Sequence, residues 1–325
     1  MNTNEEKNCE LGISNRKTKS LKKLLSFLLS LVCLYFAFQQ ANIRDIATTI
    51  TEANFIYILY TLIITGFTFL VRSIRWRILL EKTNLSLHSF SATVHIGYFL
   101  NNILPLRGGD LVRAKLFSNY HKNTRMSYVF GSLVGEKIID LWMIGLFTII
   151  LIGLGYTDVL GTQFTMILIG TYLLSSLIIF GKHTISSQLL KYIPVLENFI
   201  DGYQLVSKNK LHLFGWSIIL WTTFVFYVSV ALQSIGINLN IEEVLGLNIL
   251  SSIVTSMPLA PAAIGTYHLA VVYCLNGLYE VRLEDAQVAA VVMHSIFFVY
   301  TIIFGYVYLL TESIDIKSIT NDKEN

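Results

Sequence analysis

The chain has 325 residues, of which 54% are hydrophobic and only 14% are charged, and its mean hydropathy is +0.59. Soluble domains carry about 25% charged residues, so this composition excludes a soluble protein and predicts an integral membrane protein. The net charge of +3 is uninformative alone, and nothing indicates a nucleic-acid partner. The three cysteines lack the spacing of a disulfide framework or a metal site, and we expect no metal and no cofactor.

Six apolar runs are long enough to cross a bilayer, which takes about 20 residues. Lysines precede the first run, as they do in a signal peptide, but no small-residue cleavage site follows it, so we interpret it as a retained helix. The four tryptophans lie toward the ends of these runs and predict interfacial anchors. The expected fold is an all-α polytopic membrane protein with full spans at roughly 21–39, 53–71, 127–155, 163–181, 211–235 and 286–311.

Two further apolar regions, 90–117 and 245–280, are interrupted by proline, glycine and polar residues. Of the four prolines, Pro105, Pro258 and Pro261 lie in these regions. Broken backbone at membrane depth is tolerated only where it is buried in protein or lines a wet cavity. We therefore predict two broken, re-entrant helical hairpins, with six spans in total, or up to eight if the hairpins cross fully.

The distribution of basic residues predicts the orientation. If each clear run crosses and each hairpin returns, all of the 24 basic residues except Arg44, Lys137 and Arg282 fall on one side. The positive-inside rule makes that side cytoplasmic. We expect a multi-pass protein of the cell membrane with both termini in the cytoplasm. Its parts are a polar tail at 1–20, a membrane domain at 21–312 and a second tail at 313–325. The 182–210 loop predicts an amphipathic helix on the inner surface.

The order of helix, helix, broken hairpin and helix occurs twice, at about 21–155 and 163–311. Each half has an odd number of full crossings, so the second half must be inverted relative to the first. Inverted repeats with discontinuous helices at matching positions are typical of transporters. The order therefore predicts a transporter built as an inverted repeat.

The stretch NNILPLRGGDLVRAKLF, residues 101–117, places polar residues around the first break. A helix that starts there presents free N–H groups that suit a phosphate, and arginine can bind phosphate with two parallel hydrogen bonds. Asp110 is three residues from Arg107 and from Arg113 and can orient either one. The alternative is an ordinary basic cytoplasmic loop. The predicted phosphate site comprises Asn101, Asn102, Pro105, Arg107, Gly108, Gly109, Asp110 and Arg113.

A second polar group, Glu136, Lys137 and Asp140, lies near the start of a long apolar run. Glu136 and Asp140 share a helix face, and Lys137 can reach Asp140 at i+3. Ionisable residues within the membrane are costly and usually mark a substrate pathway or a partner. We add all three to the predicted site. The alternative is a structural cluster that is paired internally.

The second break reads TSMPLAPAAIGTYHLAVVYCL and predicts a helix start after Pro261. The side chains in its first turn can hydrogen-bond a head group. His268 is alternatively a core histidine with satisfied hydrogen bonds, and for the lone His95 and His294 we favour packing roles. The outer part of the predicted site comprises Pro258, Pro261, Gly265, Thr266, Tyr267 and His268.

Taken together, GYFLNNILPLRGGDLVRAKLF, GSLVGEKIIDLW and MPLAPAAIGTYH resemble the flippase-like transmembrane domain of lysylphosphatidylglycerol synthases, over roughly residues 20–312. The third motif departs from the family pattern at Ala262, Ala263 and His268. In two-domain members a soluble domain makes an aminoacylated lipid and the membrane domain is thought to translocate it. The resemblance therefore implies lipid translocation without lipid synthesis. The matching positions are Pro105, Arg107, Gly109, Asp110 and Arg113 in the first motif, Glu136, Lys137 and Asp140 in the second, and Pro261 and Gly265 in the third.

Two functions remain open. The first is translocation between leaflets of a lipid with an anionic or phosphate-containing head group, such as a phospholipid, a glycolipid or a polyprenyl-phosphate-linked lipid. The second is a membrane-embedded lipid-modifying transferase that uses Glu136, Asp140 or His268. A weaker third is an accessory subunit of a separate lipid or glycan synthase. No nucleophile elbow or dinucleotide fingerprint is present, so we expect no catalytic residue and favour translocation.

Overall fold

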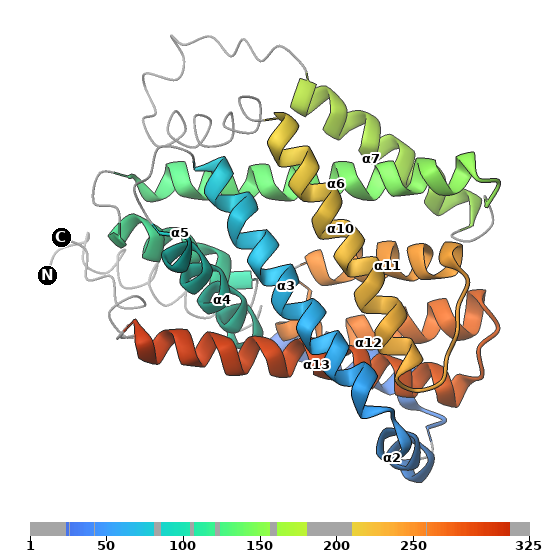
Figure 1. Ribbon diagram of the computed structural model, residues 1–325. Coiled ribbons are helices and arrows are strands. Elements are labelled where there is room, and N and C mark those ends of the chain that lie inside the picture. The colour runs from blue at the N-terminus through green and yellow to red at the C-terminus, as the bar shows by residue number, and fades with distance from the viewer. Residues whose placement is uncertain are drawn as a thin grey trace, which may run out of the picture.

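The computed structural model describes residues 24–25, 27–41, 43–80, 86–104, 107–120, 124–156, 161–180, 210–257 and 259–312. Every regular element within these ranges is a helix, which confirms the predicted all-α class (Figure 1). The elements, in chain order, are the apolar helix Phe27–Phe38, α2 Ile43–Glu52, α3 Phe55–Leu79, α4 Leu87–Ile103, α5 Gly108–Tyr120, α6 Met126–Gly153, α7 Thr162–Phe180, α10 Lys210–Gln233, α11 Ile241–Ser256, the 3-10 turn η2 Pro261–Ala263, α12 Thr266–Val272, the π-helical turn η3 Tyr273–Leu278 and α13 Leu283–Thr311.

Within the described residues, α3, α7, α10 and α13 are both long and apolar enough to cross a membrane. Helix α6 has 28 residues and is long enough to span at about 1.5 Å per residue, but its apolar sequence is interrupted by Glu136, Lys137 and Asp140. The helix Phe27–Phe38 is a shorter apolar segment. Large apolar side chains on these helices, including Leu177 and Phe226, are exposed. Because contiguous exposed apolar surface of this extent is rare on soluble proteins, we infer that these faces contact lipid.

The two interrupted regions form two hairpins. Helices α4 and α5 pack on each other, and so do α11 and α12. We call these pairs the inner and the outer hairpin, after the sides of the membrane that the basic residues predict for them. With 17 and 13 residues, α4 and α5 reach only about 26 and 20 Å, less than the roughly 30 Å of a bilayer core. The turn η2 of the outer hairpin packs against α4, so the hairpins meet inside the protein. Pro105 and Pro258 lie outside the described residues.

Helices α3 and α10 pack along each other and run antiparallel (Figure 1). The backbone N–H of Asn54, just before α3, donates to the Ser234 carbonyl, just after α10, over 2.7 Å. These helices hold the same place in the two expected halves, and an inverted repeat requires such a pair to be antiparallel. The limits of the two halves stay a prediction.

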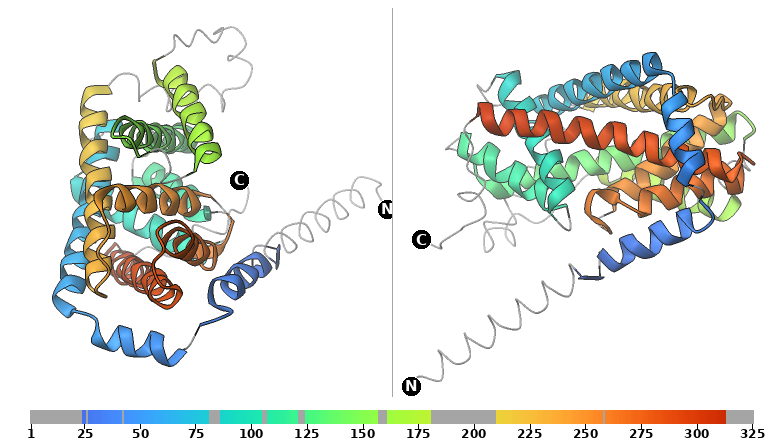
Figure 2. Two further views of the ribbon diagram at one scale, coloured as in Figure 1. Left: turned by 90° about the vertical axis from the view of Figure 1, so that its right-hand side faces the viewer. Right: turned by 90° about the horizontal axis from the view of Figure 1, so that it is seen from below.

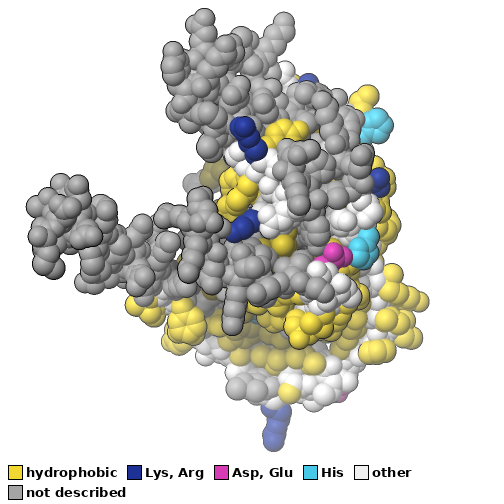
Figure 3. Space-filling view, turned by 90° about the vertical axis from the view of Figure 1, so that its left-hand side faces the viewer, with side chains coloured by type: hydrophobic (Ala, Val, Ile, Leu, Met, Phe, Trp, Pro, Cys, Tyr) yellow, Lys and Arg dark blue, Asp and Glu magenta, His cyan; other side chains and the backbone are white. Residues whose placement is uncertain are grey.

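The two ends of the molecule differ. Helix α2 lies across the end of α3 and packs on α13 (Figure 2). Figure 3 faces the opposite end, where α6 begins and α13 ends, and shows dark-blue basic side chains in its upper half, a broad area of yellow apolar side chains below them and a further dark-blue side chain at the lower edge. The amphipathic helix expected at 182–210 and both predicted tails lie almost wholly outside the described residues.

Tryptophan positions correct one expectation. Trp76 and Trp221 are fully buried, and Trp142 packs against the core. Trp76 lies against Phe90 and Phe117, so it joins α3 to the inner hairpin. These three tryptophans are packing residues rather than interfacial anchors.

Candidate functional site

A cavity of about 380 Å³ lies where the two hairpins meet the α3–α10 pair. Ligand pockets usually fall between about 300 and 1,000 Å³, so its size suits a small molecule or a lipid head group. The cavity wall takes residues from α3, α4, α6, α10, α11, α12 and α13. Segments far apart in the sequence therefore meet around one space.

Three basic side chains line this cavity: Arg72 of α3, Arg107 at the tip of the inner hairpin and Lys137 of α6. The Arg72 guanidinium lies 5.0 Å from the ring centres of both Tyr98 and Phe224, a cation–π arrangement that fixes its direction. No hydrogen bond or ion pair joins Lys137 to any residue that the structure describes. The pair between Lys137 and Asp140 that the spacing suggests is absent among these residues.

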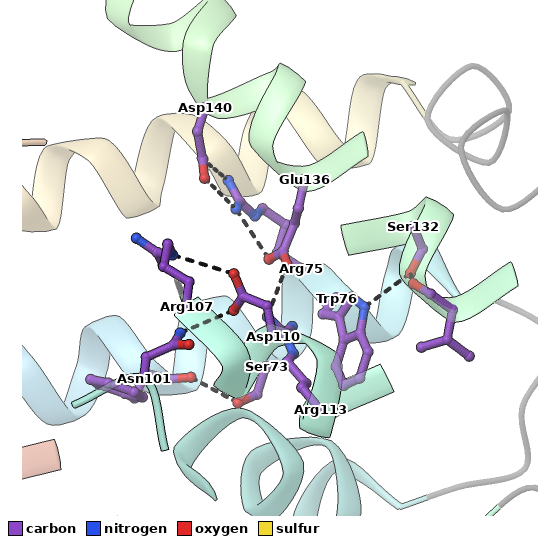
Figure 4. Close-up of polar contacts among 12 residues, drawn as sticks. Ser73, Arg75, Trp76, Asn101, Arg107, Asp110, Arg113, Ser132, Glu136 and Asp140 are labelled. Atoms are coloured by element: carbon purple, nitrogen blue, oxygen red, sulfur yellow. Dashed lines mark hydrogen bonds and ion pairs between the residues drawn. The ribbon is translucent and has the colours of Figure 1, made fainter. Parts of the chain in front are cut away.

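Arg107 is positioned by the inner hairpin itself (Figure 4). Its Nε lies 3.3 Å from Asp110 Oδ2, and Asn101 Nδ2 donates to Asp110 Oδ1 over 3.1 Å. This is the i, i+3 pair that the spacing predicts. Arg107 Nη1 also donates to the backbone carbonyl of Thr255 over 2.5 Å, and thereby joins the inner hairpin to α11. Arg107 has φ of 54°, an unfavourable backbone conformation for a residue with a Cβ.

The acidic pair of α6 has a partner that sequence analysis missed. Arg75 Nη1 lies 2.7 Å from Asp140 Oδ1, and Arg75 Nη2 lies 3.1 Å from Glu136 Oε1 (Figure 4). Hydropathy places Arg72 and Arg75 in a loop at 72–89, but α3 continues to Leu79 and Arg75 is fully buried. The apolar Ile78, Leu79 and Leu80 beyond it were the available signal that the helix continues.

Arg113 does not have the position expected of a phosphate ligand. Its Nη1 lies 3.1 Å from Glu136 Oε2, and its guanidinium lies 3.9 Å from the centre of the Trp76 ring. Neither Arg113 nor Glu136 lines the cavity. Glu136 instead bridges Arg75 and Arg113, and this part of the polar group is the structural cluster that we stated as the alternative.

The paired glycines also have a different role from the predicted one. A Cβ on Gly109 would lie 2.0 Å from the Gly97 carbonyl oxygen and 2.6 Å from the Asn101 nitrogen, and one on Gly108 would meet Leu104 at 3.1 Å. The absence of a side chain therefore lets α4 and α5 approach backbone to backbone. Gly109 is explained by packing of the inner hairpin rather than by the approach of a phosphate.

The two asparagines that precede the break do line the cavity. Asn102 Nδ2 donates to Thr301 Oγ1 of α13 over 2.8 Å, while Asn101 is bonded to Asp110. The inner hairpin therefore contributes Asn101, Asn102 and Arg107 to the cavity wall, and their role in binding a phosphate stays a prediction.

Of the predicted outer residues that the structure describes, Tyr267 alone lines the cavity. The Gly265 N–H donates to His268 Nδ1 over 3.4 Å and Thr266 Oγ1 donates to the Ala263 carbonyl, so both side chains serve the turn before α12. A Cβ on Gly265 would lie 2.3 Å from the Ser30 carbonyl oxygen, which makes it a packing contact with the first helix. Pro261 also lies off the cavity wall.

His294 of α13 belongs to the cavity, although its sequence context favours a packing role. It lines the space, and its Nε2 donates to the Ala262 carbonyl over 2.9 Å. Ala262 and Ala263, where the sequence departs from the family pattern, have φ of 52° and 56°. His294 thus contacts the strained tip of the outer hairpin.

Residues 23–305 match the family described as the lysylphosphatidylglycerol synthase TM region. The chain belongs to this family. Among relatives of this family member, a UPF0104 membrane protein of Methanocaldococcus jannaschii is 27% identical over 241 residues, 69% of this chain and 99% of the relative. The glycosyltransferase AglD of Haloferax volcanii is 21% identical over 95% of this chain and 57% of AglD.

A UPF0104 membrane protein of Pyrococcus horikoshii is 23% identical to this family member over 53% of this chain and 52% of the relative. No solved structure matches the chain. The UPF0104 relatives are themselves membrane proteins, and the family together with the apolar helices shows a multi-pass membrane protein.

Proposed function

We propose that this family member translocates a lipid with an anionic, phosphate-containing head group between the two leaflets, and that the head group enters the cavity. The observation that carries the proposal is the set of three basic side chains, Arg72, Arg107 and Lys137, around one space between the hairpin tips. Cations near low-dielectric surroundings attract an anion more strongly than they would in water.

The acids near the cavity compensate only part of this positive charge. Asp140 is the only carboxylate in the described cavity wall, and both of its oxygens are within hydrogen-bond distance of Arg75. Asp110 is bonded to Arg107 and Asn101. A cationic aminoacyl head group would therefore meet like charge without a free carboxylate. The charge pattern favours an anionic head group.

The position of the cations supports entry from the cytoplasmic leaflet. Arg72 is in the last turns of α3 and Lys137 is in the first half of α6, so both lie toward the end that the positive-inside rule makes cytoplasmic. Tyr267 and His294 come from the outer hairpin and α13. In the proposed mechanism, the tips of the two hairpins close the cavity to one leaflet while it is open to the other.

A lipid-modifying transferase is the second candidate, and the similarity to AglD, whose name is that of a glycosyltransferase, favours testing it. A general base must be within hydrogen-bond reach of the proton it removes. Glu136 and Asp140 instead face the guanidinium groups of Arg75 and Arg113. This pairing makes either carboxylate a poor base.

The test is leaflet redistribution in vesicles that contain the purified protein and a fluorescent phosphatidylglycerol. We expect protein-dependent movement of chemically intact lipid. Lys137→Gln should lower the rate about tenfold or more, because a charge-assisted hydrogen bond contributes about 1.5–3 kcal/mol and about 1.4 kcal/mol is a factor of ten. The matched control is Arg282→Gln, which removes one charge from an exposed side chain.

Recovery of a chemically altered lipid would favour the transferase. An unchanged rate in Lys137→Gln, at equal amounts of inserted protein, would contradict the proposed role of the cavity. The cytoplasmic position of both termini remains part of this proposal and is tested separately below.

A further inference from the structure

We propose that the head group is a glycosyl phosphate, in which a sugar ring is joined to the lipid through the phosphate. This inference rests on the proposed function, because it assigns a substrate class to the same cavity. It goes further by assigning separate parts of the cavity wall to the phosphate and to the sugar.

The cavity is larger than a phosphate needs. Its volume is about 380 Å³, which is the volume that more than ten molecules of liquid water occupy at about 30 Å³ each. A phosphate has only five non-hydrogen atoms and fills a smaller part of this volume. Arg72, Arg107 and Lys137 are the basic residues of the described cavity wall. A phosphate at these side chains leaves room for a group about the size of a monosaccharide.

Apart from Asp140, which is paired with Arg75, the remainder of the described cavity wall is uncharged, with hydroxyl, amide and aromatic groups side by side. Sugar hydroxyls both donate and accept hydrogen bonds, as the amides and hydroxyls of this wall do, and the C–H faces of a pyranose ring pack against aromatic rings. A bare alkyl phosphate would use neither kind of group. The relevant residues are Asn102, Asn248, Ser251, Ser252 and Thr255 among the polar ones, and Tyr98, Trp221, Tyr227, Tyr267 and Phe297 among the aromatic ones.

Several residues of the cavity wall carry buried polar atoms with no hydrogen-bond partner in the described part of the protein. They are Trp221 Nε1, Asn248 Nδ2, Asn101 Oδ1 and Arg72 Nε. Buried polar groups are nearly always bonded, and these four atoms lie in residues of one cavity wall, just beneath its surface, where a small side-chain rotation would turn each toward a polar occupant. The set contains donors and an acceptor, which suits hydroxyl groups. A ligand that accepts only, such as phosphate, would leave Asn101 Oδ1 without a donor.

The competing head groups fit less well. An aminoacyl group brings a cation to a positively charged cavity. A glycerol group has hydroxyls, but it has no ring to cover the aromatic part of the wall. The combination of anion, several hydroxyls and an apolar ring face points to a sugar phosphate.

The experiment measures binding of soluble probes to the purified full-length protein in detergent through tryptophan fluorescence, since Trp221 is in the cavity wall. The probes are glucose 1-phosphate, mannose 1-phosphate, glycerol 3-phosphate, inorganic phosphate and glucose. We expect at least one hexose 1-phosphate to bind about tenfold or more tightly than inorganic phosphate, glycerol 3-phosphate and glucose. The fluorescence change should disappear in Trp221→Phe.

Two variants separate the parts of the cavity. Asn248→Leu should bring hexose 1-phosphate affinity down to that of inorganic phosphate and leave inorganic phosphate binding unchanged, whereas Lys137→Gln should weaken both. Ser252→Ala, a smaller change on the same hairpin, should weaken only the sugar phosphates and serves if Asn248→Leu does not fold.

Equal binding of hexose 1-phosphates, glycerol 3-phosphate and inorganic phosphate would overturn the sugar assignment and leave the proposed translocation of a phosphate head group intact. Absence of hexose 1-phosphate binding would overturn it as well, and so would a fluorescence change that persists in Trp221→Phe. Failure of the proposed function has a different signature, namely vesicles in which no intact lipid changes leaflet.

Discussion

Arg75 and Asp140 face each other across the α3–α6 contact with two nitrogen–oxygen contacts, at 2.7 Å and 3.3 Å. With Glu136 and Arg113 they form a closed group of two arginines and two carboxylates. The charges of this group cancel. The positive charge of the described cavity wall therefore comes from Arg72, Arg107 and Lys137, and the pairing of Asp110 with Arg107 offsets part of it.

Arg75→Gln should destabilise the protein strongly. Removing one partner of a buried ion pair costs about 3–5 kcal/mol because the other charge is left uncompensated, and here Asp140 loses its arginine while Glu136 keeps only Arg113. The measurement is thermal unfolding of the purified protein in detergent, with Arg77→Gln on an exposed position of the same helix as control. Adding Asp140→Asn, which neutralises the carboxylate left without its arginine, should restore part of the loss. No restoration would mean that Arg75 acts through packing alone.

Arg107→Lys and Arg113→Lys should have different effects. Lysine keeps the charge but lacks the planar fork of arginine, so at Arg107 it cannot bond Asp110 and the Thr255 carbonyl together. We expect Arg107→Lys to reduce lipid transport about tenfold with little loss of stability. Arg113→Lys should lower the unfolding temperature, because Arg113 pairs with Glu136 and stacks on Trp76.

In that comparison, transport is normalised to folded, inserted protein. Normal transport by Arg107→Lys would place the first motif outside the substrate pathway. If Arg113→Lys lost transport without losing stability, Arg113 would take part in transport although it lies off the cavity wall.

Gly109→Ala should prevent the inner hairpin from closing. The added Cβ would lie 2.0 Å from the Gly97 carbonyl oxygen, which forces two backbones apart. Gly215→Ala on α10 is the matched control, because a Cβ there meets nothing within 4 Å, and alanine favours a helix over glycine by about 1 kcal/mol. We expect a large fall in the unfolding temperature for Gly109→Ala and none for Gly215→Ala, measured in detergent. Equal unfolding temperatures would contradict the close approach of α4 and α5.

Cysteine labelling of intact cells tests the orientation. Cys33 and Cys274 are buried, so with Cys9 replaced the background reaction should be low. A reporter at exposed Asn238, between α10 and α11, should react with an impermeant reagent from outside, and one at exposed Ser86, before α4, should not. The reverse pattern would invert the proposed topology and move the basic end of the cavity to the outer leaflet.

The sequence predicts the helical class, the six apolar runs and the two broken hairpins, because apolar length and proline act locally along the chain. Four of the residues that it proposes for a site, Asn101, Asn102, Arg107 and Lys137, line the cavity, and their part in binding stays a prediction. It does not reveal that Arg75 belongs to a membrane helix, since that depends on carboxylates 61 and 65 residues away. The roles of Arg113 and His294 could not be predicted either, because the first depends on Glu136 and Trp76 and the second on the strained tip of another hairpin.

The contact between Arg75 and α6 has a consequence for how the chain is made. Glu136 follows Arg75 by 61 residues, which takes roughly 3–12 s to synthesise at about 5–20 residues per second. During that interval Arg75 is in a membrane helix without its carboxylates. The free-energy cost of this buried charge is up to about 2.5–3.5 kcal/mol. The long side chain lowers this cost by extending toward the nearer membrane interface. Helix α6, with three charged residues of its own, then enters beside a helix that already presents the matching guanidinium. Synthesis of α3 before α6 therefore favours insertion of α6, whose charged residues would make it enter lipid poorly without Arg75.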